Sequence, residues 1–162
     1  MTSPTLDNRF VRSEIAVTVD TAIFTTRDGE PVVVLVERAR EPFIGTWALP
    51  GGFVEVDEDL ADAATRELRE ETGLNIPAGA LTQLGAYGNP GRDPRMRVVS
   101  IVFWAYRSDL DDPIAGSDAA DSRLIAVDHA LSSVTALAFD HRRILRDAVE
   151  TARQHRWPGS VQ

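Results

Sequence analysis

The segment from Gly51 to Gly73 places a dense run of acids between two glycine turns. Asp57 is a suitable N-cap and Gly73 stands where a left-handed C-cap is needed, so we expect a helix over about residues 58–72. The segment holds eight acids and two arginines, a net charge of −6 in a chain whose total is −8. Such a run is usually a solvated face, and a surface helix laced with salt bridges is therefore the alternative to a functional role.

The spacing of the acids favours the functional role. Glu67 and Glu71 continue the row of Leu60 and Ala64, where an amphipathic helix carries apolar residues, and Glu70 lies on the same side. Three partly buried carboxylates repel one another unless a cation or a proton offsets their charge. Hard oxygen ligands beside a loop that can expose a carbonyl suit Mg²⁺ or Mn²⁺, and magnesium in turn implies a phosphate-containing substrate.

Arg66 and the absence of cysteine narrow the chemistry further. Arg66 is spaced to pair with Asp62 and Glu70, so we expect it to orient the acids. Without cysteine there is no disulfide, thiolate ligand or cysteine nucleophile, and a metal must be held by oxygen or histidine. The three histidines have no ligand spacing: His129, His141 and His155. His141 follows Asp140, a candidate N-cap, and is expected to be a helix-start residue.

The order of these residues resembles the Nudix box at every defined position. The match runs Gly52, five residues, Glu58, seven residues, Arg66-Glu67-Leu68, one residue, Glu70-Glu71, one residue and Gly73-Leu74. The resemblance covers the chain from about Val11 to Ala152. It implies the α/β fold class of that family, a Nudix α/β/α sandwich whose mixed sheet carries the loop-helix-loop of the box.

The resemblance also implies roles for the residues of the box. The divalent-metal ligands would be Glu67, Glu70, Glu71 and the carbonyl of Gly52. Arg66 and Glu58 would form a supporting pair. Two or three Mg²⁺ ions, with Mn²⁺ as a substitute, would polarise a diphosphate and activate the attacking water. The expected activity is hydrolysis of the diphosphate linkage of a nucleoside diphosphate derivative.

Segments outside the box resemble the bacterial ADP-ribose pyrophosphatase branch and the Nudix domain of regulators of NAD metabolism. They are Arg40 to Phe43, Trp47 to Gly52, Gly91 to Arg95 and Leu137 to His141. ADP-ribose, cleaved to AMP and ribose 5-phosphate, is the expected substrate, with an oxidised nucleoside triphosphate, NADH or a nucleotide sugar as alternatives. A non-catalytic, ADP-ribose-sensing regulator is the alternative function. It would need a DNA-reading unit, and few residues follow the Asp140 helix.

Arginines in the expected loops are candidates for binding the substrate. Arg92 and Arg95 lie in a loop where bidentate contacts with a diphosphate are chemically sensible, and Arg38 and Arg40 are further candidates. For each, a solvated surface arginine is the alternative. Phe43 could stack on a base or pack in the core.

A further acid is implied by the resemblance. The segment Ala115 to Asp121 resembles a loop in which this branch carries an additional acid, usually glutamate, and Asp118 would help to deprotonate the attacking water. Aspartate is one methylene shorter, and Leu124-Ile125 replaces the aromatic pair that commonly follows. Small residues around Gly116 would let the loop close as a lid. A solvated loop acid is the alternative.

The remaining periodicity predicts helices packed on a mixed sheet. Strands are expected over residues 13–26, 32–36, 81–87, 97–106 and 123–127. Asp140 is expected to cap a last helix that buries Ile144, Leu145, Ala148 and Ala152. We expect one domain over residues 10–155, a flexible tail over 1–9 and a C-terminal tail over 156–162.

Composition limits the partners. The chain has no apolar run of membrane-spanning length and no signal peptide at its start, so we expect a cytoplasmic protein without a membrane partner. The net charge of −8 argues against a general nucleic-acid binder. A small-molecule nucleotide is the expected ligand, and a homodimer is possible because homologous pyrophosphatases are often dimers.

Overall fold

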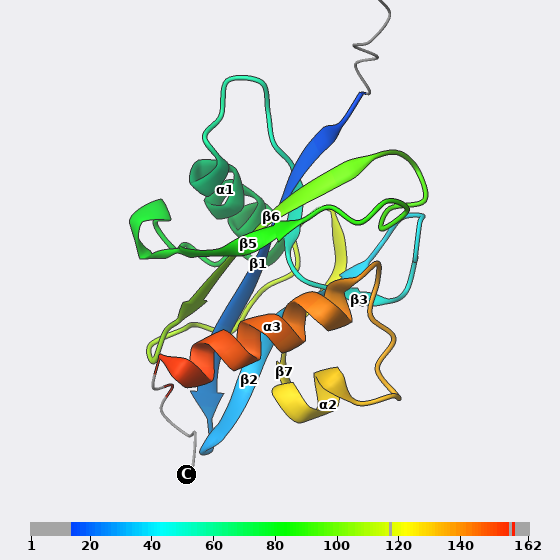
Figure 1. The fold of residues 1–162 in the computed structure, drawn as a ribbon. Helices are drawn as coiled ribbons and strands as arrows, with labels where there is room; N and C mark the ends of the chain where they lie inside the picture. The colour runs from blue at the N-terminus through cyan, green and yellow to red at the C-terminus, as the bar shows by residue number, and fades with distance from the viewer. Residues whose placement is uncertain (1–13, 117, 156, 158–162) are drawn as a thin grey trace, which may run out of the picture.

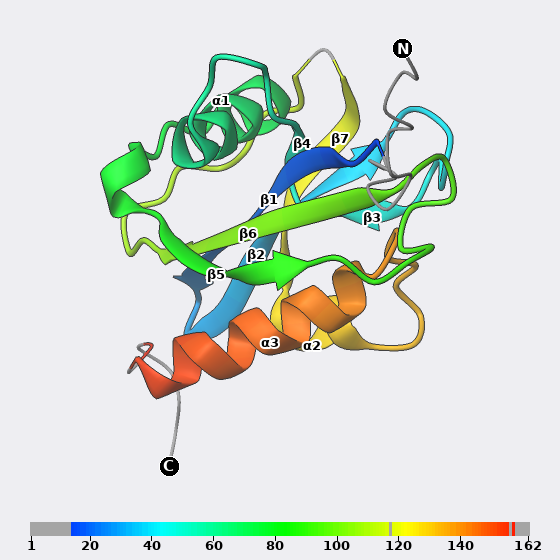
Figure 2. The same cartoon turned by 45° about the horizontal axis from the view of Figure 1, so that its top comes forward.

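The chain folds around one mixed β-sheet with helices on both of its faces (Figures 1 and 2). The structure, a computed structural model, describes residues 14–116, 118–155 and 157. Its elements are β1 (Ala16–Arg27), β2 (Glu30–Arg38), β3 (Trp47–Ala48), β4 (Gly51–Phe53), α1 (Leu60–Thr72), the 3₁₀ helix η1 (Ala78–Ala80), β5 (Thr82–Tyr87), β6 (Val98–Tyr106), β7 (Ala119–Ala126), α2 (Val127–Leu131) and α3 (His141–Gln154). Among the described residues, no helix is long and apolar enough to cross a membrane.

Strand β1 is the centre of the sheet. It pairs in parallel with β6 and antiparallel with β2 and β4, in the order β3-β2-β1-β6-β5, and β7 is added to β2. Residues 18–25 are all buried because both faces of the sheet are covered, which explains the nearly continuous run of apolar and β-branched residues. Asp28 and Gly29 have positive φ angles and form the tight turn into β2.

Helix α1 covers one face of the sheet. Its Ala63, Ala64 and Leu68 are completely buried, and they pack in clusters with Val19 and Ile23 of β1. Each large apolar side chain buried in this way contributes about 1.5–3 kcal/mol to folding. The acidic helix is therefore fixed to the central strand by its apolar stripe, which leaves its carboxylates at the edge of the contact.

Helix α3 covers the opposite face together with α2 (Figure 2). The predicted apolar stripe of this helix is confirmed, because Ile144, Leu145, Ala148 and Ala152 are all buried. They share a cluster with Phe24 of β1. The α/β/α sandwich expected from the resemblance is thus confirmed.

The predicted strands are present, with different ends. β2 extends beyond residues 32–36 on both sides, and β7 begins at Ala119 rather than near residue 123. The segment expected as a loop from Ala115 to Asp121 is therefore partly strand, because residues 119–126 pair with β2. The sequence did not indicate α2, whose five residues are too short for a helical period to be visible.

The predicted start of α1 was wrong. Asp57 lies in a turn and is exposed, whereas Asp59 has extended backbone and its Oδ1 accepts a hydrogen bond from the Ala61 N–H at 3.3 Å. The helix therefore begins at Leu60. The predicted end is confirmed, because Gly73 has a φ of 71° and its N–H donates to the carbonyl of Arg69.

The predicted tails fall mostly outside the described residues, with one exception. Trp157, expected in the C-terminal tail, is buried, and its ring centroid lies 4.7 Å from that of Phe24. The packed domain therefore reaches beyond residue 155.

Candidate active site

A pocket of about 460 Å³ lies where α1, β4 and the start of α3 meet. Acids of α1 line one part of it, namely Glu67 and Glu71. The four arginines predicted to bind substrate line it as well: Arg38, Arg40, Arg92 and Arg95. Gly52, Arg66 and Asp118 complete the predicted residues that reach the pocket, whereas Glu70 and Phe43 are not among the lining residues. The pocket thus brings carboxylates and guanidinium groups from distant parts of the sequence into one cavity.

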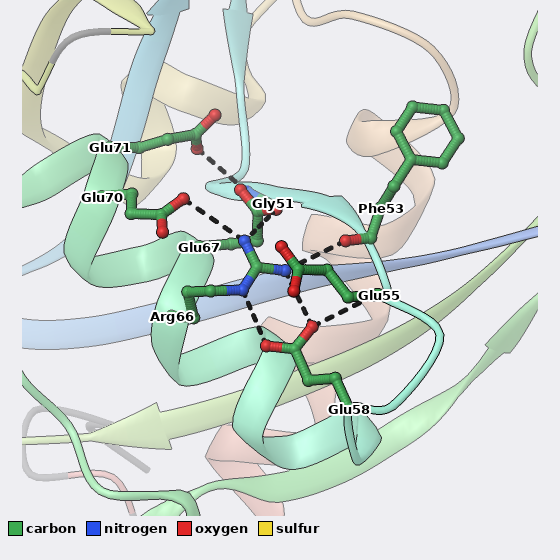
Figure 3. A network of polar contacts seen from close by, with 8 residues as sticks. All are labelled: Gly51, Phe53, Glu55, Glu58, Arg66, Glu67, Glu70 and Glu71. Atoms are coloured by element: carbon green, nitrogen blue, oxygen red, sulfur yellow. Dashed lines mark hydrogen bonds and ion pairs between the residues drawn. The ribbon is translucent and has the colours of Figure 1, made fainter.

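Arg66 forms hydrogen bonds with several acids of the box (Figure 3). Its Nε and Nη2 donate to the two oxygens of Glu58 at 2.7 and 2.8 Å, and its Nη1 donates to Glu67 at 2.8 Å and to Glu70 at 3.3 Å. Nη2 also donates to the carbonyl of Phe53. The pair of Glu58 and Arg66 implied by the resemblance is therefore present, and these hydrogen bonds lower the pKa of Glu58.

The partners of Arg66 differ in one respect from the prediction. Glu70 is a partner as expected, but Asp62 is exposed and makes no ion pair with Arg66. The guanidinium turns instead toward Glu58, which precedes the helix and is only 14% exposed. A planar guanidinium with five donors can serve several carboxylates at once, and here it links the loop before α1 to the helix itself.

Glu67 and Glu71 lie against the glycines of β4. Glu71 Oε2 accepts a hydrogen bond from the Gly51 N–H at 3.0 Å (Figure 3). A Cβ at Gly52 would stand 2.5 Å from the Glu67 carboxylate, so a larger residue there would push that carboxylate away from the backbone. Burial raises the pKa of Glu67, and burial together with the nearby Glu67 and Asp20 charges raises the pKa of Glu71 to about 8. Negative charge is therefore concentrated here beyond what Arg66 offsets.

This donor set fits a divalent cation. It offers partly buried carboxylates and a close backbone segment, which are hard oxygen ligands, and a cation would favour the ionised form of carboxylates whose pKa is raised by burial. As the side chains are oriented, the described residues contain no group of three or more acids or histidines that could hold a metal ion. The reason is visible in Figure 3, where Glu70 points to Arg66 and Glu71 to Gly51.

The loop arginines are already paired with aspartates. Arg92 donates two hydrogen bonds to Asp140, at 2.7 and 3.1 Å, and its side chain is 4% exposed. Arg95 donates two to Asp93, at 2.7 and 3.0 Å, but remains 43% exposed. Asp140 therefore occupies the N-cap position of α3 without capping it by its side chain, in contrast to the prediction.

Arg38 and the aromatic residues form a second wall. Arg38 donates to the carbonyl of Pro42 at 2.7 Å, and its guanidinium carbon lies 4.9 Å from the ring centre of Phe139. Burial and the neighbouring Arg95 lower the pKa of Arg38. Phe43 packs against Phe139 with centroids 4.8 Å apart and does not line the pocket, whereas Phe139 does. The aromatic side chains that line the pocket are thus Phe53 and Phe139, neither of which was predicted from the sequence to contact a base.

Asp118 and Arg40 meet at the pocket. Their side chains form an ion pair at 3.1 Å and are both exposed. The segment before them is fixed, because Gly116 donates its N–H to the carbonyl of Glu71 and a Cβ there would stand 1.7 Å from the Glu70 carbonyl. Gly116 is therefore held against the end of α1, and closure of the loop as a lid stays a prediction.

Among the polar residues that line the pocket and were not predicted as site residues are Asp20 and His141. Asp20 and His141 are buried and line it, with Asp20 Oδ1 3.5 Å from His141 Nε2. Asp20 is the one acid inside the buried run of β1, which was a signal that the sequence analysis passed over. His141 is a helix-start residue, as predicted, and its ring is buried.

The fold and the pocket define a class: an α/β/α protein in which an acid-bearing helix faces a cavity lined by both carboxylates and arginines. The family model described as NUDIX domain matches residues 16–148, and the chain belongs to the Nudix family.

Sequence comparisons relate the chain to an enzyme and to a regulator. It is 43% identical over 116 residues to an ADP-ribose pyrophosphatase of Methanocaldococcus jannaschii, which covers 71% of this chain and 64% of that protein. It is 35% identical over 133 residues to the ADPR responsive transcriptional repressor NtrR of Acinetobacter baylyi, with 81% of this chain and 52% of that protein covered. The chain therefore spans less than two thirds of either curated relative.

The chain is also similar in structure to a solved Nudix domain. The NUDIX domain of Shewanella oneidensis NrtR, crystallised with ADP ribose, superposes with a TM-score of 0.77 at 32% identity, covering 90% of this chain and 95% of that one. The NrtR of the same organism has also been crystallised with a 27mer DNA.

Proposed function

We propose that this chain is a Mg²⁺-dependent hydrolase, with Mn²⁺ as a possible substitute, that cleaves the diphosphate linkage of ADP-ribose to AMP and ribose 5-phosphate. The observation that carries the proposal is that two partly buried acids, Glu67 and Glu71, and five arginines line one pocket of about 460 Å³. A diphosphate bridged to cations on one side and to guanidinium groups on the other would satisfy both sets of charges. The similarity to an ADP-ribose pyrophosphatase and to a domain bound to ADP ribose supports this substrate.

In this proposal the acids bind the metal ions and the arginines bind the phosphates. Glu67, Glu70, Glu71 and the Gly52 carbonyl would hold the divalent ions, which supply compensation of the phosphate charge and activation of water. Arg66 orients Glu67 and Glu70 through its hydrogen bonds. Arg38 and Arg95 lie within reach of one another around Phe139 and would bind the phosphates, with Arg40 and Arg92 beside them. Hydrolysis then adds water across one P–O bond of the linkage and releases two monophosphates.

Turnover of a substrate panel tests this function. With Mg²⁺ present, kcat/KM should be highest for ADP-ribose among ADP-ribose, NADH, an oxidised guanosine triphosphate and a nucleotide sugar, with AMP and ribose 5-phosphate as the products. A tenfold preference for a nucleoside triphosphate would contradict the proposed substrate but not the hydrolysis of a diphosphate linkage.

Glu67→Gln and Glu71→Gln should each lower kcat by about 100-fold or more, because a ligand charge is lost from a helix that keeps its packing. Near-normal rates and metal dependence in both variants would contradict the metal assignment.

Sensing of ADP-ribose without turnover is the second candidate, and the similarity to a transcriptional repressor favours it. Calorimetry together with an assay for AMP separates the two functions, since a sensor binds ADP-ribose with Mg²⁺ present and releases no AMP over hours.

The absence of a nucleic-acid partner, the homodimer and the cytoplasmic location remain predictions from the sequence.

A further inference from the structure

His141 is a buried side chain at the pocket that the chemistry above does not use. It is 3% exposed at the start of α3. Its Nδ1 lies 3.0 Å from the Leu49 nitrogen and accepts a hydrogen bond from that N–H. A ring nitrogen that accepts carries no proton, so the proton of the neutral ring is on Nε2. Burial lowers the pKa of His141, which agrees with a neutral ring.

The other side of the ring meets a second polar group. Nε2 lies 3.5 Å from Oδ1 of Asp20, whose Oδ2 accepts a hydrogen bond from the Ser100 hydroxyl at 2.5 Å. His141 therefore stands between a backbone donor, the Leu49 N–H, and a buried carboxylate. Each ring nitrogen has one of these partners, so the two contacts can be removed separately.

The Leu49 amide belongs to the segment that leads to Gly52. Leu49 is 2% exposed, so its N–H would be a buried donor without a partner if the ring were lost. The Pro50 carbonyl accepts from the N–H and the hydroxyl of Thr21, at 2.8 and 3.1 Å, and Gly51 donates to Glu71. Gly52 pairs with Val19 in the sheet. Every residue of the segment 49–52 is thus fixed, and His141 fixes its first residue.

We propose that His141 is a positioning residue of the active site: by accepting the Leu49 hydrogen bond, it holds the segment 49–52 in the register that keeps the Gly52 backbone beside Glu67. The ring acts through the backbone and does not contact the substrate. The inference rests on the proposed function only in assigning a metal to Gly52 and Glu67. This role explains why α3 begins with a histidine, because a neutral imidazole offers an acceptor toward Leu49 and a donor toward Asp20.

Three substitutions separate the two contacts. In His141→Asn the amide oxygen can replace Nδ1 as the acceptor, and in His141→Gln the longer amide can replace Nε2 toward Asp20. His141→Leu removes both contacts. His129→Asn is the matched control, because His129 is exposed and does not line the pocket.

Hydrogen exchange of the Leu49 amide and Mn²⁺ binding, followed by electron paramagnetic resonance, are the two readouts. We expect His141→Gln and His141→Leu to speed exchange at Leu49 and to weaken Mn²⁺ binding about 10- to 100-fold, the usual effect of losing a residue that orients a metal site. His141→Asn should stay within about threefold of wild type in both, as should His129→Asn. In turnover with Mg²⁺, the weakened variants should lose kcat with little change in KM for ADP-ribose.

Several results would overturn the proposal. Rescue by glutamine and not by asparagine would place the role in the Asp20 contact. Wild-type exchange at Leu49 in His141→Gln would show that the hydrogen bond does not hold the segment. The asparagine and glutamine variants decide the question even where leucine prevents folding. Wild-type protein that binds no Mn²⁺ would contradict the proposed metal site, while the exchange at Leu49 would still test the positioning of the segment.

Discussion

Arg92 and Arg95, three residues apart in one loop, differ in what they can still bind. Arg92 is enclosed with Asp140 against the start of α3, whereas Arg95 holds Asp93 and keeps much of its guanidinium in solvent. Removing one partner of a buried pair leaves an uncompensated charge, which costs about 3–5 kcal/mol when burial is complete. Removal of either arginine leaves a buried or partly buried aspartate without its partner, but only Arg95 also offers an exposed guanidinium to a ligand.

We expect Arg92→Ala to lower the stability of the fold by about 2–4 kcal/mol, because Asp140 loses its partner beside α3. Arg95→Ala leaves Asp93, whose side chain is only 3% exposed, without its arginine, so it should lower stability by a similar amount and should in addition raise KM for ADP-ribose. Urea unfolding and steady-state kinetics on both variants make the comparison. An unchanged KM in Arg95→Ala would show that its exposed guanidinium does not bind the substrate.

Asp118 differs from Asp121 in a way that a single pair of variants can detect. Asp118 faces the pocket and pairs with Arg40, while Asp121 lies in β7 and its carboxylate pairs with Arg123. If Asp118 assists deprotonation of the water, Asp118→Asn should lower kcat by about 10²- to 10⁴-fold with little change in KM. Asp121→Asn should remain near wild type.

Arg40→Ala distinguishes a general base from a salt bridge. It removes the ion pair but keeps the carboxylate, so kcat should be retained if Asp118 acts on the proton. Wild-type kcat in Asp118→Asn would instead direct attention to Glu70 or Glu67 in the box.

At the level of the elements, Gly116 joins the segment before β7 to the end of α1. A methyl group there would meet the Glu70 carbonyl at 1.7 Å, and backbone on both sides leaves it little room to move. We expect Gly116→Ala to destabilise the fold by about 1–3 kcal/mol, as overpacking does, and to lower Tm by several degrees. Because the displaced residues are Glu70 and Glu71, kcat should fall as well.

Gly79→Ala is the control for this substitution. Gly79 lies in η1, has no positive φ, and a Cβ there would meet nothing within 4 Å. Its Tm should be unchanged or slightly higher, because alanine reduces the freedom of the unfolded chain. Equal Tm values for the two alanine variants would mean that the contact at Gly116 relaxes without cost.

The elements show where sequence patterns suffice and where they do not. The helix α1, its end at Gly73 and its box residues could be predicted because they form one contiguous segment in which spacing determines contact. The cap at Asp59 could not, because Asp57 and Asp59 are equal by capping propensity and the ion pair of Glu58 with Arg66, which fixes the segment between them, is a tertiary contact. Asp20 and His141 are 121 positions apart, and only the fold brings them together.

For the whole molecule, the acids of the site couple folding to pH in the metal-free state. The pKa of Glu71 rises from an ordinary value of 4.5 to about 8, chiefly through burial. The folded chain therefore binds more protons than the unfolded chain between these values, and this contribution to stability is present below about 4.5 and is lost as pH rises through about 8.

Unfolding of the metal-free protein between pH 5 and 8 tests this coupling. We expect the stability of wild type, relative to Glu71→Gln, to fall with rising pH by up to about 1.4 kcal/mol per pH unit. Saturating Mg²⁺ should reduce the fall in wild type and leave the variant unchanged, because a cation compensates the ionised Glu71. A pH-independent difference between the two proteins would show that Glu71 is ionised at its ordinary value in the folded state.

The distribution of the pocket residues along the chain has a consequence for evolution. The acids expected to hold the metal and their arginine come from α1, whereas Arg38 ends β2, and Arg95 and Phe139 lie in two separate connections between elements. Mutations in those connections can therefore alter which nucleotide is held without disturbing the hydrolytic half. Related proteins with this fold can therefore change their ligand through substitutions in the loops. They can also lose catalysis and keep ligand binding, as a sensor does, without a change of fold.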